Sequence, residues 1–134
     1  GEIRQFVSGD SRWGGGVVFE GTTRAETDPQ HGSLKYLEYE AYRDMALRKL
    51  QGLAEAALTR WSLGRVAMLH RLGCVGPAEV SVVVAVAAAH RAECFDACRW
   101  LIDTLKMDVP IWKRDVYADG FTRWVDPNIA NGTR

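Results

Sequence analysis

The chain has 134 residues, a length that suits one domain with a real core and is too short for two. Its 17 Lys and Arg residues balance 17 Asp and Glu residues, so no overall positive charge favours nucleic acid or anionic lipid as a partner. Hydrophobic residues make up 47% and charged residues 25%, as in ordinary globular proteins, and no apolar run is long enough to cross a bilayer. Any anion-binding site must therefore be local.

A strand, a long loop, a second strand and a helix are predicted in the first part of the chain. Residues 1–13 show no clean period, so we expect a loosely attached N-terminal arm. Residues 14–21 predict a short strand, and residues 22–33 have the Asp, Pro, Gly and Ser residues of a loop. Residues 34–42 alternate as a strand with one wetter face, and residues 43–61 are helical. The apolar stripe of this helix is expected to contain Leu47, Leu50, Ala54, Leu58 and Trp61.

Two more strands and a second helix follow. GRVAMLHRLG, residues 64–73, predicts a strand in which His70 alternates outward with Met68, as a strand-face residue and not a ligand. VSVVVAVAA, residues 80–88, is apolar at both parities, which is typical of a strand covered on both faces. The spacing then becomes helical until shortly before Pro110. The apolar face of this second helix is expected to contain Phe95, Cys98, Leu101, Ile102 and Leu105.

A hairpin and a tail complete the chain. IWKRDVY alternates as a strand that leaves the helix, and Asp119-Gly120 is a hairpin turn signal before FTRWV. Residues 126–134 have no periodicity, so we expect a frayed tail. Together the elements predict an α+β fold, with two helices on a mainly antiparallel sheet and a C-terminal hairpin, in one domain that spans residues 14–125.

Three cysteines, Cys74, Cys94 and Cys98, are an odd number without the spacing of a disulfide framework. They predict reduced thiols in a cytoplasmic compartment. Cys94 and Cys98 share a helix face, and no His or carboxylate set at ligand spacing accompanies them, so they are expected in the core. The sequence therefore predicts neither a metal site nor a cofactor.

Basic residues stand at both ends of the second helix. His90 and Arg91 lie where the buried strand meets the helix N-terminus, a place that favours anions. Arg91 would add a planar fork suited to phosphate, and His90 a group that titrates near neutrality. Lys106 lies in the last turn, and Lys113 follows Pro110. Each of these cations, taken alone, has the alternative of being solvated or of capping the helix.

The length of this helix limits what one substrate can reach. Arg91 and Lys106 are fifteen residues apart, which at ~1.5 Å per residue separates them by roughly 22 Å. Either the chain has two unrelated basic spots, or a second copy brings its helix start to the helix end of the first. The second alternative predicts a homodimer with two composite sites.

Several segments in combination resemble one known family. From about Gly15 to Val125 the chain resembles the large, catalytic subunit of molybdopterin synthase in the order and spacing of its segments. The segments that carry the resemblance are GRVAMLHRLG, the valine-rich strand, AAAHRAECFDACRWLIDTLK, VPIWKRD and DGFTRWV. The resemblance implies an α/β hammerhead fold and a homodimer that carries a small ubiquitin-like subunit on each side, a heterotetramer. It also implies transfer of sulfur from the small subunit's C-terminal thiocarboxylate to cyclic pyranopterin monophosphate, which creates the dithiolene of molybdopterin.

The same resemblance implies the site residues. Lys106 and Lys113 match active-site lysines, with Lys106 expected nearest the thiocarboxylate and Lys113 expected as general acid or base. The expected substrate-binding set also contains Thr22, Thr23, Arg24, His90, Arg91, Arg114 and Asp115. Asp115 stands where the family suggests Glu. The pocket arginine that the family suggests beyond Trp124 is absent from residues 126–128, which leaves Arg123 as the candidate substitute.

Two rival interpretations remain beside the sulfur transferase. One is a non-catalytic dimeric scaffold that binds a pterin or another anion. The other is an oligomerising domain whose cations are solvated. The joint presence of both lysines with His90 and Arg91 favours the enzyme, because a scaffold has no need of that set.

Overall fold

The computed structural model describes residues 2–125 of the chain. Its elements are α1 (Glu2–Val7), β1 (Gly15–Thr22), β2 (Thr27–Asp28), β3 (Gly32–Ala41), α2 (Arg43–Arg60), β4 (Leu63–His70), β5 (Gly73–Val75), β6 (Val80–Ala88), α3 (Arg91–Asp108), β7 (Ile111–Tyr117) and β8 (Thr122–Val125). The order confirms the predicted strands and both long helices, and adds α1 and the short strands β2 and β5. The predicted tail, residues 126–134, lies outside the described residues.

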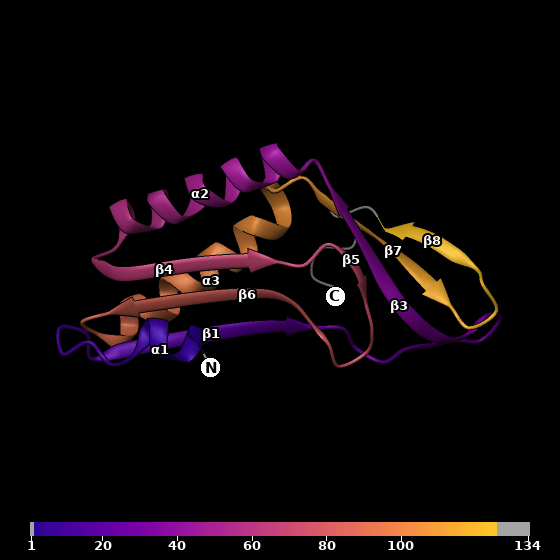
Figure 1. Ribbon diagram of the computed structural model, residues 1–134, viewed down its shortest axis with the longest axis horizontal. Helices are drawn as coiled ribbons and strands as arrows, with labels where there is room; N and C mark the ends of the chain where they lie inside the picture. Colours follow the sequence, from indigo (N-terminus) through magenta and orange to yellow (C-terminus); the bar gives the residue numbers. More distant parts are fainter. Residues whose placement is uncertain (1, 126–134) are drawn as a thin grey trace.

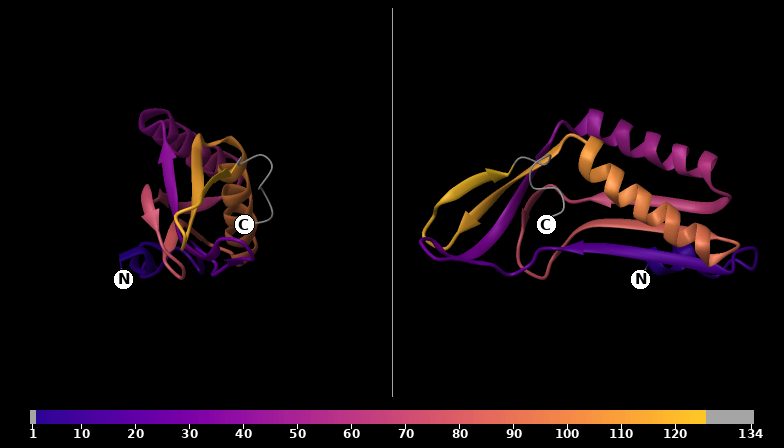
Figure 2. Two further views of the ribbon diagram at one scale, coloured as in Figure 1. Left: turned by 90° about the vertical axis from the view of Figure 1, so that its right-hand side faces the viewer. Right: turned by 180° about the vertical axis from the view of Figure 1, so that it is seen from behind.

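Two sheets lie end to end in an elongated molecule (Figure 1). The first has the strand order β1-β6-β4, and the second has the order β2-β3-β7-β8, with β5 paired to β3. Every strand pairing within these sheets is antiparallel. Helices α2 and α3 lie together on one side of the first sheet, as the view from behind shows (Figure 2). The predicted α+β class with a mainly antiparallel sheet is confirmed.

Strand β6 is the centre of the first sheet and is covered on both faces, as its apolar sequence predicts. It pairs with β1 on one edge and with β4 on the other. Val84 and Val86 pack toward the helices with Leu101, whereas Ala85 and Ala87 point the opposite way. All five of these side chains are 0% exposed. The valines supply bulk under the helices, and the alanines leave room on the other face.

That room is filled by α1, so the expected loose attachment of the N-terminal arm is wrong for residues 2–7. Val7 is buried against Ala85 and Ala87, with Phe6 and Trp13 packed around it. The guanidinium of Arg65 on β4 donates to the Phe6 carbonyl over 3.2 Å and lies over both aromatic rings. A helix of six residues is too short to show a period in the sequence, which explains the error.

The predicted apolar stripe is nearly right for α3 and only partly right for α2, where Leu50 and Trp61 pack against the core but other predicted positions do not. On α2 the buried residues are Ala46 and Ala57, while Leu47 and Leu58 are 58% and 46% exposed. On α3 the predicted Phe95 is 60% exposed, although the other four predicted positions are buried. On α2 small side chains occupy the closest approach to the sheet, so a stripe drawn through its largest residues is only partly right.

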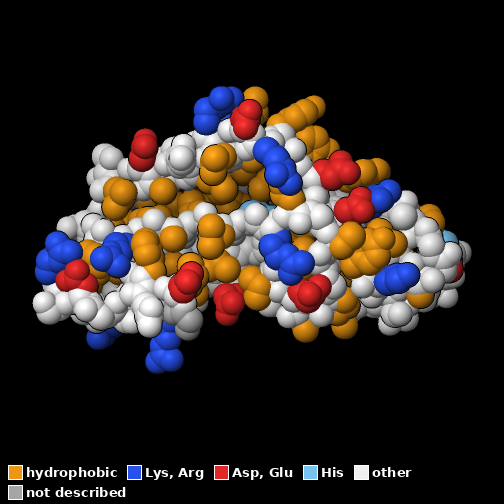
Figure 3. Space-filling view, viewed as in Figure 1, with side chains coloured by type: hydrophobic (Ala, Val, Ile, Leu, Met, Phe, Trp, Pro, Cys, Tyr) orange, Lys and Arg blue, Asp and Glu red, His pale blue; other side chains and the backbone are white. Residues whose placement is uncertain are grey.

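The face of the first sheet that carries α1 is not covered along its whole length. Val18 on β1 is 38% exposed and Leu69 on β4 is 54% exposed on this side. Figure 3, drawn from the same side as Figure 1, shows hydrophobic side chains at the surface here. The isolated chain thus has apolar surface in contact with solvent beside α1.

Candidate active site

A pocket of about 490 Å³ lies where the two sheets meet the C-terminal half of α3. Phe19 comes from β1, Tyr39 from β3, Leu105 from α3 and Trp112 from β7. The volume is within the range of small-molecule sites, and the wall combines apolar side chains with a few charged ones. Elements from both sheets therefore build one site.

Three cations line this pocket from three different elements. Lys106 is in the last turn of α3, Lys113 is on β7, and Arg24 follows the end of β1. The helix ends at Asp108, and the chain then turns at Pro110 into β7, which places the two lysines near each other. Glu20 of β1 also borders the pocket, and Glu26 lies 3.9 Å from Arg24. The excess of positive charge suits an anionic ligand.

The two threonines expected in the substrate-binding set also line the pocket. Thr22 is exposed, whereas Thr23 is 4% exposed and is fixed by backbone hydrogen bonds to Ala78 and Glu79. The Thr23 hydroxyl is buried and has no hydrogen-bond partner among the described residues. A buried polar atom without a partner is costly, so this hydroxyl is suited to meet a ligand atom.

His70 is a pocket residue that sequence reasoning missed. The predicted outward orientation of Met68 and His70 is wrong, because Met68 packs against the core beneath the helices and His70 lines the pocket. The ring lies edge-on to Tyr39, with centroids 4.9 Å apart. Burial lowers the pKa of His70, and the positive charges of Lys113 and Lys106 lower it further. One indication of this role was present in the sequence: His70 stands near the end of a predicted strand, where side chains often contribute to a site.

His90 and Arg91 lie at the opposite end of α3 from Lys106. His90 is the N-cap residue with an extended backbone, and its side chain makes no capping hydrogen bond. Both side chains are exposed, and neither lines the pocket. Helix α3 is continuous over 18 residues, so the separation of roughly 22 Å between Arg91 and Lys106 that the sequence predicts applies to the folded chain. Within one chain, therefore, His90 and Arg91 are separated from the predicted site residues that line the pocket.

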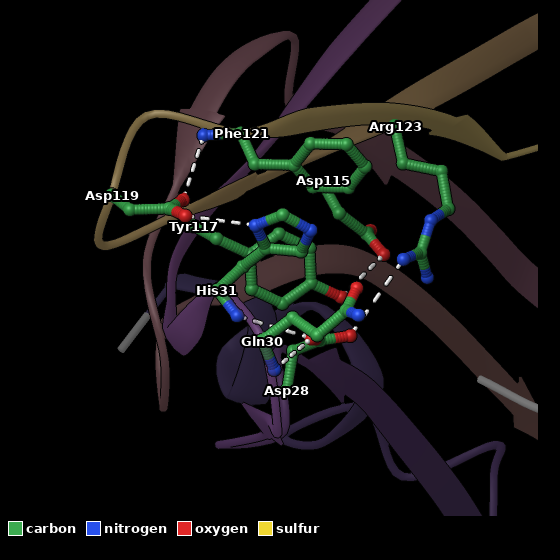
Figure 4. Close-up of polar contacts among 8 residues, drawn as sticks. All are labelled: Asp28, Gln30, His31, Asp115, Tyr117, Asp119, Phe121 and Arg123. Atoms are coloured by element: carbon green, nitrogen blue, oxygen red, sulfur yellow. Dashed lines mark hydrogen bonds and ion pairs between the residues drawn. The ribbon is translucent and has the colours of Figure 1, made fainter.

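Arg114, Asp115 and Arg123 do not line the pocket. Arg114 forms a 2.6 Å ion pair with Glu38. Asp115 is 1% exposed and accepts a hydrogen bond from the Tyr117 hydroxyl over 3.3 Å. Arg123 lies 3.7 Å from Asp28 at the far end of the second sheet, among the residues drawn in Figure 4. In this chain the three side chains make contacts within the second sheet and away from the pocket.

The cysteines have structural positions. Cys94 and Cys98 are buried in the core, as predicted, and burial raises the pKa of both thiols. A raised pKa makes a thiol a poor nucleophile, so neither of them suits covalent catalysis. Within residues 2–125, no three His, Cys, Asp or Glu side chains are grouped as metal ligands would be. None of the helices in that range combines the length and the apolar character that a bilayer crossing requires.

Comparison with known proteins places this geometry in a family. The model of the MoaE protein family matches residues 1–108. The chain belongs to the MoaE protein family. It is 44% identical over 108 residues to the molybdopterin synthase catalytic subunit of Thermoplasma volcanium, an alignment that covers 81% of this chain and 77% of that protein.

Two further members of this family show the extent of the likeness. The molybdopterin synthase catalytic subunit of Oryza sativa subsp. indica is 47% identical over 104 residues, which are 78% of this chain and 53% of the rice protein. The chain thus spans about half the length of that relative. The crystal structure of molybdopterin synthase from Staphylococcus aureus superposes with a TM-score of 0.85 at 32% identity, covering 93% of this chain and 88% of that one. The fold is therefore shared over nearly all of the chain.

Proposed function

We propose that this chain is the catalytic subunit of a molybdopterin synthase and that sulfur transfer takes place in the pocket around Lys106 and Lys113. The substrate is cyclic pyranopterin monophosphate, and the sulfur arrives on the C-terminal thiocarboxylate of a small ubiquitin-like subunit. Both reactants are anions, and the pocket presents three cations to them. The observation that carries the proposal is the meeting of Lys106, Lys113 and Arg24 in one pocket of suitable volume.

The lysines suit the charge that develops in this reaction. When the thiocarboxylate sulfur attacks the pterin and the resulting acyl intermediate collapses, negative charge grows on oxygen. An ammonium group in a partly buried pocket stabilises that charge or donates a proton to it. Lys106 is assigned to the thiocarboxylate and Lys113 to proton transfer. Arg24 and Thr23 are assigned to the substrate, because a guanidinium and an unpartnered hydroxyl suit phosphate or pterin oxygens.

The anion site is completed by a second copy of the chain. His90 and Arg91 lie too far along α3 to reach a substrate held at Lys106 in the same chain. A two-fold dimer in which each copy supplies its α3 start to the other's pocket would gather both groups twice. With one small subunit on each side the assembly is a heterotetramer. Free thiols at all three cysteines are in keeping with a cytoplasmic location.

Reconstitution tests the function directly. Purified chain, thiocarboxylated small subunit and cyclic pyranopterin monophosphate are mixed, and formation of the dithiolene product is followed. Lys106→Ala is expected to lower the rate at least ~100-fold, because an electrostatic contribution to the transition state is lost. Lys49→Ala, on the exposed side of α2, removes the same charge away from the pocket and is expected to leave the rate unchanged.

The outcome separates the enzyme from its main rival. Dimerisation and binding of the small subunit are measured in parallel for each variant. Product formation by the wild type and its loss in Lys106→Ala, with both assemblies intact, supports the proposal. A wild-type chain that binds the pterin and the small subunit but forms no product would instead favour the non-catalytic scaffold.

A further inference from the structure

His70 lines the pocket but has no assigned part in sulfur transfer. It is the last residue of β4 and pairs with Val82 of β6, so its ring points to the side of the sheet on which the helices lie. The structure places the imidazole in the same wall as Lys106 and Lys113. Its role can be derived from its hydrogen bond and its surroundings.

The hydrogen bond of His70 determines which ring nitrogen can accept a proton. Nδ1 lies 2.7 Å from the carbonyl oxygen of Arg71. A carbonyl oxygen cannot donate, so Nδ1 must carry the hydrogen of this bond. In the neutral ring the lone pair is then on Nε2. The backbone thus holds the ring in the tautomer whose acceptor is the nitrogen farther from the strand.

Burial and the titratable groups around His70 favour the neutral form of the ring. Those that share its pocket or contact it are Lys106 of α3, Lys113 of β7, Tyr39 of β3, Glu20 of β1, Arg24 and the adjacent Arg71. Burial is the largest cause that holds the pKa of His70 below its ordinary value of 6.5, and the positive charges of Lys113 and Lys106 lower it further, against the opposing effect of the hydrogen bond to the Arg71 carbonyl. At neutral pH the pocket therefore combines ammonium groups, which stabilise an oxyanion, with an imidazole that accepts a proton.

We propose that His70 is the general base that activates water to cleave the acyl intermediate and release the small subunit. This rests on the function proposed above. In that intermediate the carbonyl carbon of the small subunit's tail is bonded to the sulfur now attached to the pterin. As the water oxygen forms its bond to that carbon, one water proton passes to Nε2 of His70. The carbon–sulfur bond breaks, and its electron pair stays on sulfur as a thiolate on the pterin.

The remaining protons are accounted for by the solvent. The tail leaves as a carboxylic acid that ionises and gives up the second water proton, and the imidazolium returns the first to bulk water. Charge that develops on the carbonyl oxygen during the attack is stabilised by Lys106 or Lys113. An ammonium group has no lone pair for the water proton, whereas neutral His70 has one. The two residue types thus have complementary tasks in one pocket.

The matched variant for this test is His70→Asn. The Asn side-chain amide can keep the hydrogen bond to the Arg71 carbonyl but has no group in place of Nε2. The enzyme with its small subunit is mixed with cyclic pyranopterin monophosphate in a single turnover, quenched in acid and analysed by mass spectrometry. We expect the single-turnover rate of product formation to fall ~100-fold or more and the acyl intermediate to accumulate. In steady-state assays we expect kcat to fall by a similar factor while KM changes little. His31→Asn, which removes a histidine at the far end of the second sheet, is the control and is expected to retain wild-type turnover.

The pH profile gives a second, independent readout. In the wild type, kcat should decline as the pH falls through a value below 6.5, because protonated His70 cannot accept from water. That acid limb should be absent in His70→Asn. A variant that turns over within about twofold of the wild type would overturn the proposal, as would slow turnover with an unchanged acid limb and no acyl intermediate. Absence of product with the wild type would instead refute the function on which it rests.

Discussion

Asp119 joins the turn between β7 and β8 to the turn between β2 and β3 at the far tip of the second sheet. Its carboxylate accepts a 2.8 Å hydrogen bond from His31 Nδ1 and a 2.9 Å bond from the Phe121 backbone N–H (Figure 4). His31 in turn stacks on the Phe121 ring at 3.8 Å. These bonds, the one from His31 first, hold the pKa of Asp119 below its ordinary value. The residue therefore makes stability depend on pH.

The sign of that dependence follows from proton linkage. A carboxylate whose pKa is lower in the folded state stabilises the fold at any pH above its unfolded pKa of ~3.9, and the effect is lost as the pH falls through the folded value. Asp119→Asn keeps an acceptor for Phe121 but loses the charge. We expect the variant to be less stable than the wild type at pH 6 and nearly equal to it at pH 2, measured by urea unfolding. If the difference in the free energy of unfolding between the variant and the wild type were the same at pH 2 and pH 6, it would contradict a stabilising charge on Asp119.

At the residue scale the sequence predicted the pocket cations and missed their neighbour. Lys106 and Lys113 were singled out by the resemblance to a known family, and the turn at Pro110 between α3 and β7 explains why both line one pocket. His70 was missed because alternation along β4 defines two faces without saying which of them lies under the helices. Arg114 and Asp115 adjoin Lys113 in sequence, but they belong to the packing of the second sheet.

Two glycines offer a matched test of how α1 is attached. A methyl group on Gly64 of β4 would overlap the indole of Trp13, whereas one on Gly52 of α2 would meet nothing within 4 Å. Gly64→Ala should displace Trp13 and destabilise the protein by about 1–3 kcal/mol. Gly52→Ala should stabilise it by roughly 0.5–1 kcal/mol, since alanine restricts the unfolded helix segment. Urea unfolding measures both.

The two glycine variants are expected to change stability in opposite directions, so a general effect of adding a methyl group cannot explain both results. Should Gly64→Ala unfold at the same urea concentration as the wild type, the indole would not lie against β4 in solution and α1 would be loosely held after all. Tryptophan fluorescence of the Gly64→Ala protein adds a local readout, because displaced Trp13 would become more accessible to solvent.

At the element scale, long segments with a strong pattern were predictable and short ones were not. The valine-rich strand β6 and helices α2 and α3 follow from composition and period, since each buries a face that the sequence marks. Helix α1 and strands β2 and β5 are too short for a period, and they exist because neighbouring elements present a surface or an edge to them. Helix rotation was set by small residues at the contact, a tertiary property that large apolar residues do not reveal.

At the scale of the whole molecule, the two basic groups lie at opposite ends of α3 and can share one substrate only if a second chain brings them together. One copy has Lys106 and Lys113 in its pocket, and it exposes His90 and Arg91 at the far end of the same helix. If a two-fold dimer brings these groups together, each pocket depends on residues from both chains. Neither Lys106→Ala nor His90→Ala homodimers should then transfer sulfur at a substantial rate.

Mixed dimers distinguish a composite site from two unrelated basic spots. In a dimer of one Lys106→Ala chain and one His90→Ala chain, one pocket has lost both residues and the other has kept both. We expect about half of the wild-type activity per dimer, because a two-fold axis generates two pockets of which one is intact. The chains are given different affinity tags, purified in succession and assayed for dithiolene formation. Verified mixed dimers that stay as inactive as the parent variants would contradict a pocket built from Lys106 of one chain and His90 of the other.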